Sequence, residues 1–187
     1  MTTEGPRIPP LPPDQWEGDI KQILEAVPGG VDSRLGDNNI FPTLARHPDL
    51  FRAWLRFAGY LLTSGKLPGR DRELLILRTA VNCDSSYEWG QHVRISLAGG
   101  MEREEIDRVL EGADADGWSA HDAALLRAAD ELHRDSRVSD GTWEALAQTY
   151  DTERLIEATM VVGHYHLVAF ALNTFGVELD EGLEPLP

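Results

Sequence analysis

Apolar residues recur every three to four positions along almost the whole chain, and this spacing is the strongest constraint on its fold. The segment from about Asp71 to Asn82 is the extreme case. Its consecutive apolar residues 74–77 lie nearly all round a helix, so we expect that helix at the centre of a bundle. Strand-like alternation of convincing length is absent from the sequence. The pattern predicts an all-α protein with short connections.

Capping residues indicate where individual helices begin and end. Ser119 and Asp151 are good N-cap residues, and Gly176 suits the end of a helix. We expect the longest helix between Asp151 and Gly176. Other helices are expected over roughly 14–29, 47–63, 85–99, 101–110 and 119–132, with a short one near residue 143.

The chain has 187 residues, which suits one domain with one core. Residues 1–13 are rich in proline and are predicted to form an extended N-terminal arm, followed by a single helical domain over 14–187. The arm has the composition of a ligand for a proline-recognising module. We favour an arm that lies on its own domain or on a neighbouring subunit, because Ile8 and Leu11 are apolar.

The net charge of −15 argues against nucleic acid as a partner, because binding to phosphates depends on lysine and arginine. The single cysteine excludes an intrachain disulfide and fits a reducing compartment. The N-terminus lacks a signal-peptide pattern, and we find no apolar run near the roughly 20 residues that cross a bilayer. The sequence therefore predicts a cytoplasmic protein without a membrane partner.

Two carboxylates and an imidazole stand within otherwise apolar segments. Glu88 and His92 are four positions apart and share one helical face. Glu73 lies on the preceding predicted helix, and a tight turn at Cys83–Asp84 would bring it across to His92. A histidine between two carboxylates is suited to general acid–base catalysis.

Structural roles are also open for these residues. Ser85 and Glu88 match the Ser-x-x-Glu capping box, in which Glu88 only binds a backbone amide. Glu73 is favoured in the first turn of a helix and can pair with Arg70 or Arg78. On spacing alone, a structural role for His92 is more common than a catalytic one.

Cys83 precedes a predicted helix N-terminus, where backbone amides lower the pKa of a thiol. A single-cysteine redox protein is therefore an alternative, although a small buried side chain is the commoner role. A metal site would need Glu73, Glu88, His92 and one residue of the pair His164 and His166, which point to different faces of a helix. We expect no metal and no cofactor.

Further polar and aromatic residues are candidates for a substrate pocket. Asn173 is polar within an apolar helix and needs a partner or a wet cavity. Trp89 and Tyr165 fit a pocket wall or the core equally well. Arg72, Arg78 and Arg94 are candidates for binding a substrate carboxylate. The complete set of expected substrate contacts is Ser85, Trp89, Tyr165, His166 and Asn173.

The block from Glu73 to Ile106 carries a family resemblance. Its elements are Arg72-Glu73-Leu74, Asn82-Cys83, Tyr87-Glu88-Trp89-Gly90-Gln91-His92-Val93, Ala98-Gly99-Gly100-Met101 and Glu104-Glu105-Ile106. This block resembles the carboxymuconolactone decarboxylase family of the alkylhydroperoxidase D-like superfamily, and the resemblance extends over roughly 44–177. Its peroxidase branch carries Cys-x-x-Cys-x-x-x-His after an upstream glutamate. Here the cysteine positions hold Ser85 and Glu88, while Glu73 and His92 are kept.

The resemblance implies an all-helical, alkylhydroperoxidase D-like bundle that assembles as a homo-oligomer: a trimer, or a dimer or hexamer. It also implies a cofactor-independent lyase or isomerase acting on a small carboxylated or lactone substrate. His92 would be the acid–base group, Glu73 would orient it, and Glu88 would be a second acid–base group. The alternatives are a thiol-dependent peroxidase using Cys83, which the missing cysteine pair disfavours, and a non-catalytic oligomeric binding protein.

Overall fold

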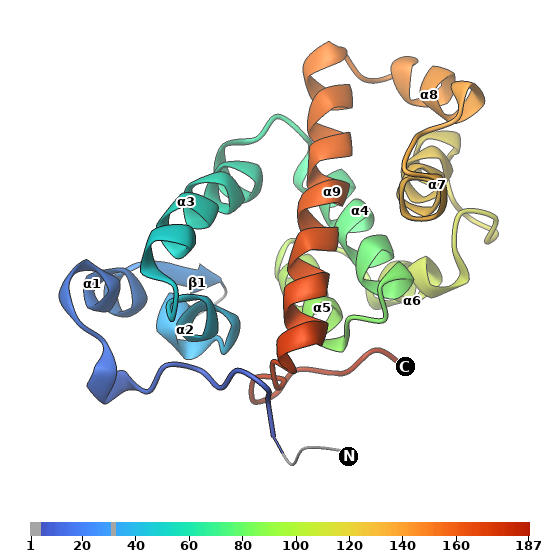
Figure 1. The fold of residues 1–187 in the computed structure, drawn as a ribbon. Helices are drawn as coiled ribbons and strands as arrows, with labels where there is room; N and C mark the ends of the chain where they lie inside the picture. The colour runs from blue at the N-terminus through green and yellow to red at the C-terminus, as the bar shows by residue number, and fades with distance from the viewer. Residues whose placement is uncertain (1–4, 31–32) are drawn as a thin grey trace.

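The computed structural model describes residues 5–30 and 33–187, and helices dominate it (Figure 1). The helices are α1 (Gly18–Ala26), α2 (Ile40–Leu44), α3 (Pro48–Gly59), α4 (Gly69–Asn82), α5 (Ser86–Ala98), α6 (Arg103–Glu111), α7 (Ala120–Asp135), α8 (Asp140–Ala147) and α9 (Thr152–Phe175). Shorter helical turns are η1 (Pro13–Gln15), η2 (Leu35–Asp37) and the π-helical η3 (Tyr60–Ser64). The predicted all-α fold is confirmed.

Helix α4 lies at the centre of the bundle, as its apolar pattern predicts. Leu74, Leu75, Ile76 and Leu77 are all 0% exposed, and α4 packs against α5, α6, α7 and α9. Complete burial of one such side chain contributes about 1.5 to 3 kcal/mol. The central helix therefore supplies much of the stability and fixes the position of Glu73 on the same helix.

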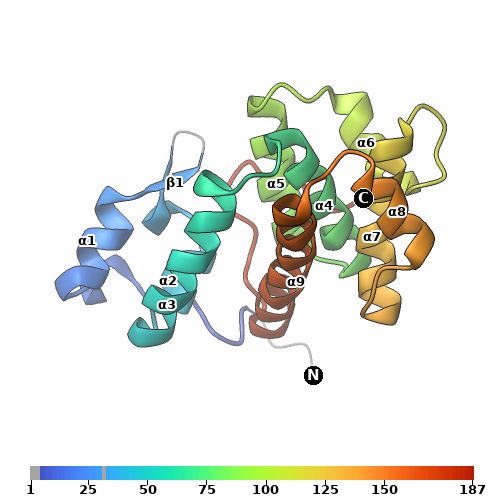
Figure 2. The same cartoon turned by 90° about the horizontal axis from the view of Figure 1, so that it is seen from above.

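The N-terminal helices form a second group beside the bundle. Helices α1 to α3 lie on one side of α9, and α6 to α8 lie on the other side, as both views show (Figures 1 and 2). A small cluster around Phe51 and Leu24 holds the N-terminal group together. Trp54, Phe41 and Leu44 also contact the main core, and this shared contact joins the two groups.

A two-stranded hairpin between α1 and α2 departs from the sequence expectation. Strand β1 (Pro28–Gly30) pairs antiparallel with β2 (Ser33–Arg34), and Pro28 lies opposite Arg34. Strands this short leave no measurable alternation of apolar and polar residues, which is why the sequence pattern did not reveal them.

Residues 5–12 of the proline-rich arm are extended and lie on the chain's own helices; residues 1–4 are outside the described part. The Ile8 amide donates to the Phe175 carbonyl, and the Leu11 amide donates to the Pro42 carbonyl. Pro13 already belongs to the turn η1. The division into an arm and one helical domain near residue 13 stays a prediction.

Helix α9 is long and apolar enough to cross a bilayer, by length and composition, contrary to the sequence analysis. Of its apolar 18-residue window, 56% is buried inside the protein, as in the core helix of a soluble protein. Buried Glu157 on α9 accepts hydrogen bonds from the Lys66 and Leu67 amides at 2.7 and 3.0 Å. These contacts tie α9 to the loop before α4.

Candidate functional site

A tight turn brings α4 and α5 side by side. Helix α4 ends in a Schellman motif, with the Ser85 amide donating to the Ala80 carbonyl and the Asp84 amide donating to the Val81 carbonyl. Asp84 has a φ of +50°, the left-handed conformation that this motif requires at its C′ position. The turn sets the register between the two helices and so places His92 opposite Glu73.

Glu73 and His92 form a buried pair. The Oε2 atom of Glu73 lies 2.7 Å from Nδ1 of His92, and the two side chains are 4% and 7% exposed. Burial alone would raise the pKa of Glu73, but the charges and hydrogen bonds of His92 and Arg72 hold it below its usual value. An ionised carboxylate only accepts hydrogen bonds, so Nδ1 of His92 must carry the proton.

Arg72 fixes the other oxygen of this carboxylate. Its Nε and Nη2 atoms donate to Oε1 of Glu73 at 3.1 and 3.0 Å, and its Nη1 donates to the Leu62 carbonyl. Leu62 belongs to the π-helical turn η3, where the regular helical bonding of α3 has ended. Arg72 therefore couples the end of α3 to the orientation of the His92 ring. Among the described residues, Nε2 of His92 has no hydrogen-bond partner.

Glu88 is buried without a partner. Its residue exposure is 2%, and neither carboxyl oxygen makes a hydrogen bond. Burial raises the pKa of Glu88 well above its usual value, so the carboxyl is held in the protonated form. Ser85 is the N-cap of α5 but makes no side-chain cap bond, and its hydroxyl is also unpartnered. The capping-box interpretation of these two residues is therefore wrong.

Tyr165 on α9 closes one side of the pair. Its ring meets the His92 ring edge-on at a centroid distance of 4.9 Å. Burial, to which the neighbouring acidic side chains of Glu73 and Glu88 add, raises the pKa of Tyr165 far above its usual value, so its hydroxyl stays protonated. Trp89, at 1% exposure, lies in the hydrophobic core. The structure thus gathers Glu73, His92, Glu88 and Tyr165.

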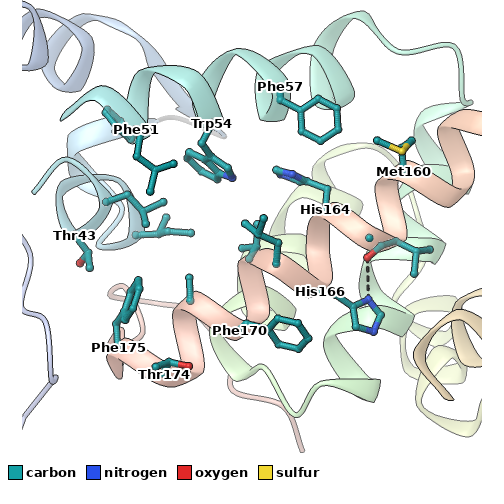
Figure 3. Close-up of a pocket in the computed structure, with 18 of the residues that line it drawn as sticks. Thr43, Phe51, Trp54, Phe57, Met160, His164, His166, Phe170, Thr174 and Phe175 are labelled. Carbon is teal, nitrogen blue, oxygen red and sulfur yellow. Dashed lines mark hydrogen bonds between the residues drawn. The ribbon is translucent and has the colours of Figure 1, made fainter. Parts of the chain in front are cut away.

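A large apolar groove lies beside this cluster, between α3 and α9 (Figure 3). Its volume is about 1340 Å³, and its walls include Trp54 and Phe57 on one side and Met160 and Phe170 on the other. Glu73, Glu88 and His92 do not line it.

His164 connects the groove to the buried cluster, and the sequence analysis gave it no such role. Its ring stacks on Trp54 at 6.0 Å and meets the Tyr165 ring edge-on at 5.3 Å. Burial and the charge of His92 lower the pKa of His164 to about 4, so the ring is neutral at neutral pH. The only signal in the sequence for this contact was the position of polar His164 within an otherwise apolar helix.

The remaining predicted residues lie elsewhere. His166 faces α7 rather than α3, consistent with its separation from His164 by two positions. Asn173 is exposed and donates from Nδ2 to the Cys83 carbonyl at 2.8 Å. The three arginines proposed for a substrate carboxylate all have internal partners. These partners are Glu73 for Arg72, Asp130 for Arg78 and Gln91 for Arg94.

Cys83 is the C-cap of α4 and lies in the turn just before α5, where the sequence placed it. Burial, with the nearby Glu88 carboxyl adding to it, raises the pKa of the Cys83 thiol to about 11. The expectation of a lowered pKa is therefore wrong, because burial disfavours the charged thiolate. At neutral pH it is a thiol and a weak nucleophile.

The sequence was compared with known protein families. Residues 48–131 match the carboxymuconolactone decarboxylase family. The resemblance stated above is therefore confirmed over this part of the chain, which holds Glu73, Glu88 and His92. With only one cysteine, the chain lacks the Cys-x-x-Cys pair. A comparison with curated proteins gives no match.

Several solved structures have a similar fold. An uncharacterised peroxidase-related protein from Silicibacter sp. TM1040 superposes with a TM-score of 0.79 at 13% identity, over 100% of this chain and 95% of that one. An alkylhydroperoxidase D core protein from Ralstonia eutropha JMP134 superposes with a TM-score of 0.71 at 21% sequence identity, with 93% of each chain covered. The debrominase Bmp8 superposes with a TM-score of 0.78 at 13% sequence identity, over 93% of this chain and 92% of that one. At these identities the likeness shows the fold alone.

Proposed function

We propose that this protein is a cofactor-independent acid–base enzyme that decarboxylates or isomerises a small carboxylated or lactone substrate. The observation that carries the proposal is the buried pair of Glu73 and His92, in which Nδ1–H is held by an ionised carboxylate and Nε2 is left without a partner. An imidazole fixed in this way presents one nitrogen for proton transfer. The match of residues 48–131 to a decarboxylase family supports the same chemistry.

In the decarboxylation that we propose, the bond between the substrate carbon and its carboxylate breaks and CO₂ leaves. The electron pair remains on the substrate as an enolate, and Nε2 of His92, which takes up one proton from water in each turnover, delivers that proton to the carbon. Glu73 stabilises the imidazolium before this transfer. Glu88 and Tyr165 stay protonated and serve as hydrogen-bond donors to the developing negative charge.

The groove between α3 and α9 is the proposed route to this cluster. His164 lies between the groove and Tyr165, so a substrate arriving from the groove reaches His92 by displacing the His164 ring. Because His164 is neutral at neutral pH, its displacement moves no charge. A small apolar ring carrying one carboxylate fits this route better than a polyanion, since the walls are largely apolar.

The thiol-dependent alternative has less support. It needs a reactive Cys83, but the thiol has a raised pKa of about 11 and no second cysteine exists in the chain to resolve an intermediate. Thiol-dependent peroxide reduction should therefore be no faster with the wild type than with Cys83→Ala. A clear loss of peroxide reduction in Cys83→Ala would restore the redox function.

We also propose that the chain assembles with copies of itself in the cytoplasm through the exposed apolar face of α9, which is also one wall of the groove, so that a second copy would cover the groove over a bound substrate. Ile156, Met160, Leu167 and Phe170 on this helix are 47% to 62% exposed, and a monomer seldom leaves such a face uncovered. Light scattering coupled to gel filtration should give a multiple of the 20.8 kDa chain mass for the wild type. Phe170→Glu should give the monomer, and an unchanged mass in this variant would exclude the face.

The catalytic proposal is tested by screening carboxylated lactones and β-keto acids for CO₂ release. The reaction in deuterated water should also place deuterium on the product carbon. His92→Asn and Glu73→Gln should each lose activity at least about a hundredfold, the lower end of the effect of a positioned acid–base group. His121→Asn is the matched control, because His121 pairs with Asp71 and lies outside both the buried cluster and the groove. Full activity in His92→Asn would refute the proposed site.

A further inference from the structure

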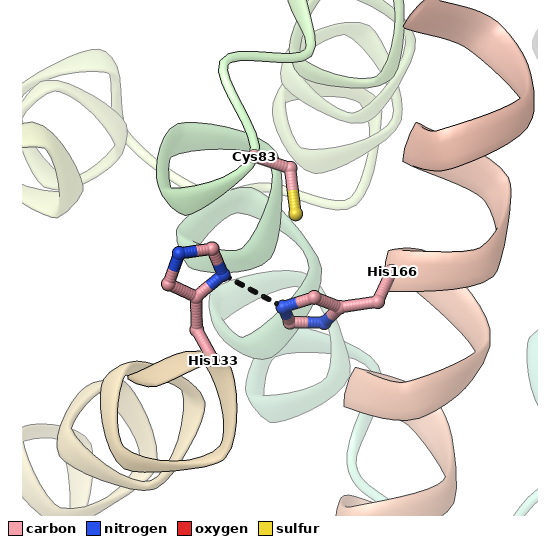
Figure 4. A group of neighbouring side chains, drawn as sticks. All are labelled: Cys83, His133 and His166. Atoms are coloured by element: carbon pink, nitrogen blue, oxygen red, sulfur yellow. Dashed lines mark hydrogen bonds between the residues drawn. The ribbon is translucent and has the colours of Figure 1, made fainter. Parts of the chain in front are cut away.

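Three side chains that are ligands for transition metals converge at one point outside the proposed catalytic cluster (Figure 4). They are Cys83 at the end of α4, His133 in the last turn of α7 and His166 in the middle of α9. The Sγ atom and the two ring nitrogens all lie within 4.8 Å of one another. We propose that they form a metal site that takes Zn²⁺.

The two imidazoles already face each other nitrogen to nitrogen. Nδ1 of His133 lies 3.0 Å from Nε2 of His166. In a tetrahedral zinc site with usual bond lengths, neighbouring ligand atoms are about 3.3 to 3.6 Å apart. The two nitrogens therefore need to separate by a few tenths of an ångström, and the thiol sulfur, which lies within 4.8 Å of both, would have to approach them by at most about 1 Å.

His166 has the orientation that a metal ligand needs. Its Nδ1 lies 2.8 Å from the Val162 carbonyl, and a carbonyl only accepts, so Nδ1 carries the proton and Nε2 presents a lone pair. A backbone carbonyl that fixes the far nitrogen is the usual outer partner of a metal-bound histidine. Without a metal, the Nε2 lone pair accepts the Nδ1–H of His133, and His133 can move that proton to its exposed Nε2 when an ion binds.

Cys83 is held in place by the same helix that carries His166. Asn173 on α9 donates to the Cys83 carbonyl at 2.8 Å, which gives this exposed amide a structural purpose. Binding of Zn²⁺ would replace the thiol proton, so that the site gains a divalent cation and releases one proton. The resulting thiolate and two neutral imidazoles are a ligand set that zinc favours over magnesium or calcium.

The site would join α4, α7 and α9, the three helices that pack most extensively in the core. Three protein ligands leave a fourth position on a tetrahedral ion. His133 and His166 also line the groove between α3 and α9, so this position would be reached from the groove by water or a small anion. The site thus combines a cross-link between helices with an accessible metal ion.

The test is metal binding by protein prepared without a histidine tag and stripped with a chelator. Calorimetry with Zn²⁺ alone should give one equivalent per chain and about one proton released, and the thermal midpoint should rise. Co²⁺ alone should give a thiolate-to-metal charge-transfer band in the near ultraviolet. Cys83→Ala should abolish this band, and His133→Ala and His166→Ala should each weaken binding at least about tenfold, as expected when one ligand is lost.

Two control variants keep the test specific. His133 is exposed, so His133→Ala should fold normally, which far-ultraviolet circular dichroism can check. His47→Ala removes an exposed histidine at another part of the groove and should bind Zn²⁺ like the wild type. Absence of saturable binding by the wild type would overturn the proposal. One-equivalent binding that persists in Cys83→Ala and His133→Ala, or that is lost in His92→Ala, would also overturn it.

Discussion

Replacing Glu88 by glutamine should change how the stability of this protein depends on pH. Glu88 is fully buried, both of its oxygens are unpartnered, and its pKa in the folded state lies well above the ordinary value of 4.5. The folded chain therefore keeps a proton that the unfolded chain releases as pH rises. The stability is complete below the unfolded pKa and declines with rising pH until the folded pKa is passed.

The size of this change in the free energy of unfolding is set by the single proton that Glu88 keeps in the folded state. Each pH unit in which only the folded state is protonated costs about 1.4 kcal/mol. Glutamine has nearly the same shape and no proton to retain, and its amide is left unpartnered like the neutral carboxyl. The two proteins should thus be similarly stable near pH 4. Between pH 5 and pH 6, Glu88→Gln should gain about 1.4 kcal/mol on the wild type.

Urea denaturation at a fixed protein concentration, followed by circular dichroism, measures this difference. Comparison of variant and wild type at each pH cancels the contributions of all other titrating groups. Glu144→Gln is the control, because Glu144 is exposed on α8 and its replacement should leave the pH profile unchanged. A stability difference that stays constant between pH 5 and pH 6, or that favours the wild type as pH rises, would refute a protonated Glu88.

Three other substitutions test the packing and the pairing. Glu73→Gln removes the buried negative charge that pairs with Arg72 and should cost about 3 to 5 kcal/mol in urea denaturation. The pKa of Glu73 is lower in the folded chain than in the unfolded chain, so ionised Glu73 adds to the free energy of unfolding above the unfolded pKa. This stabilisation is lost as the pH falls through the folded pKa. If Glu73→Gln costs as much stability at acidic pH as at neutral pH, the lowered pKa is refuted. Asp151→Ala removes the N-cap of α9 and should cost about 1 kcal/mol in the same assay. Leu75→Ala should cost about 2 to 5 kcal/mol, and a smaller loss would argue against the central place of α4.

Much of the fold was predictable because its signals are local. Ser119 and Asp151 cap α7 and α9 through their own side chains, and Gly176 ends α9 with a φ of +68°. The apolar run in α4 required a central position whatever the neighbours were. The approach of Glu73 to His92 also followed from the sequence, since two helices joined by a short turn must lie side by side.

Other features depend on contacts that no local pattern records. Whether Glu88 caps α5 or stays buried is decided by the helices packed against it. The pKa of the Cys83 thiol was predicted to be lowered but is raised, because its burial depends on the residues packed around the turn. His133 and Cys83 are 50 positions apart in the chain, so only the packing of α7 against α4 could bring them together.

Helix α9 is synthesised later than the helices it packs against, and this order affects how the chain folds during synthesis. This helix leaves the ribosome after all the others, yet it packs against α4, α5, α7 and α8 and binds the N-terminal arm through the Ile8 amide. Until about residue 175 has emerged, the apolar surface of α4 that α9 will cover stays open to water. The nascent chain therefore passes through an interval in which its central helix is only partly covered, and a chaperone that holds exposed apolar segments can bind it there.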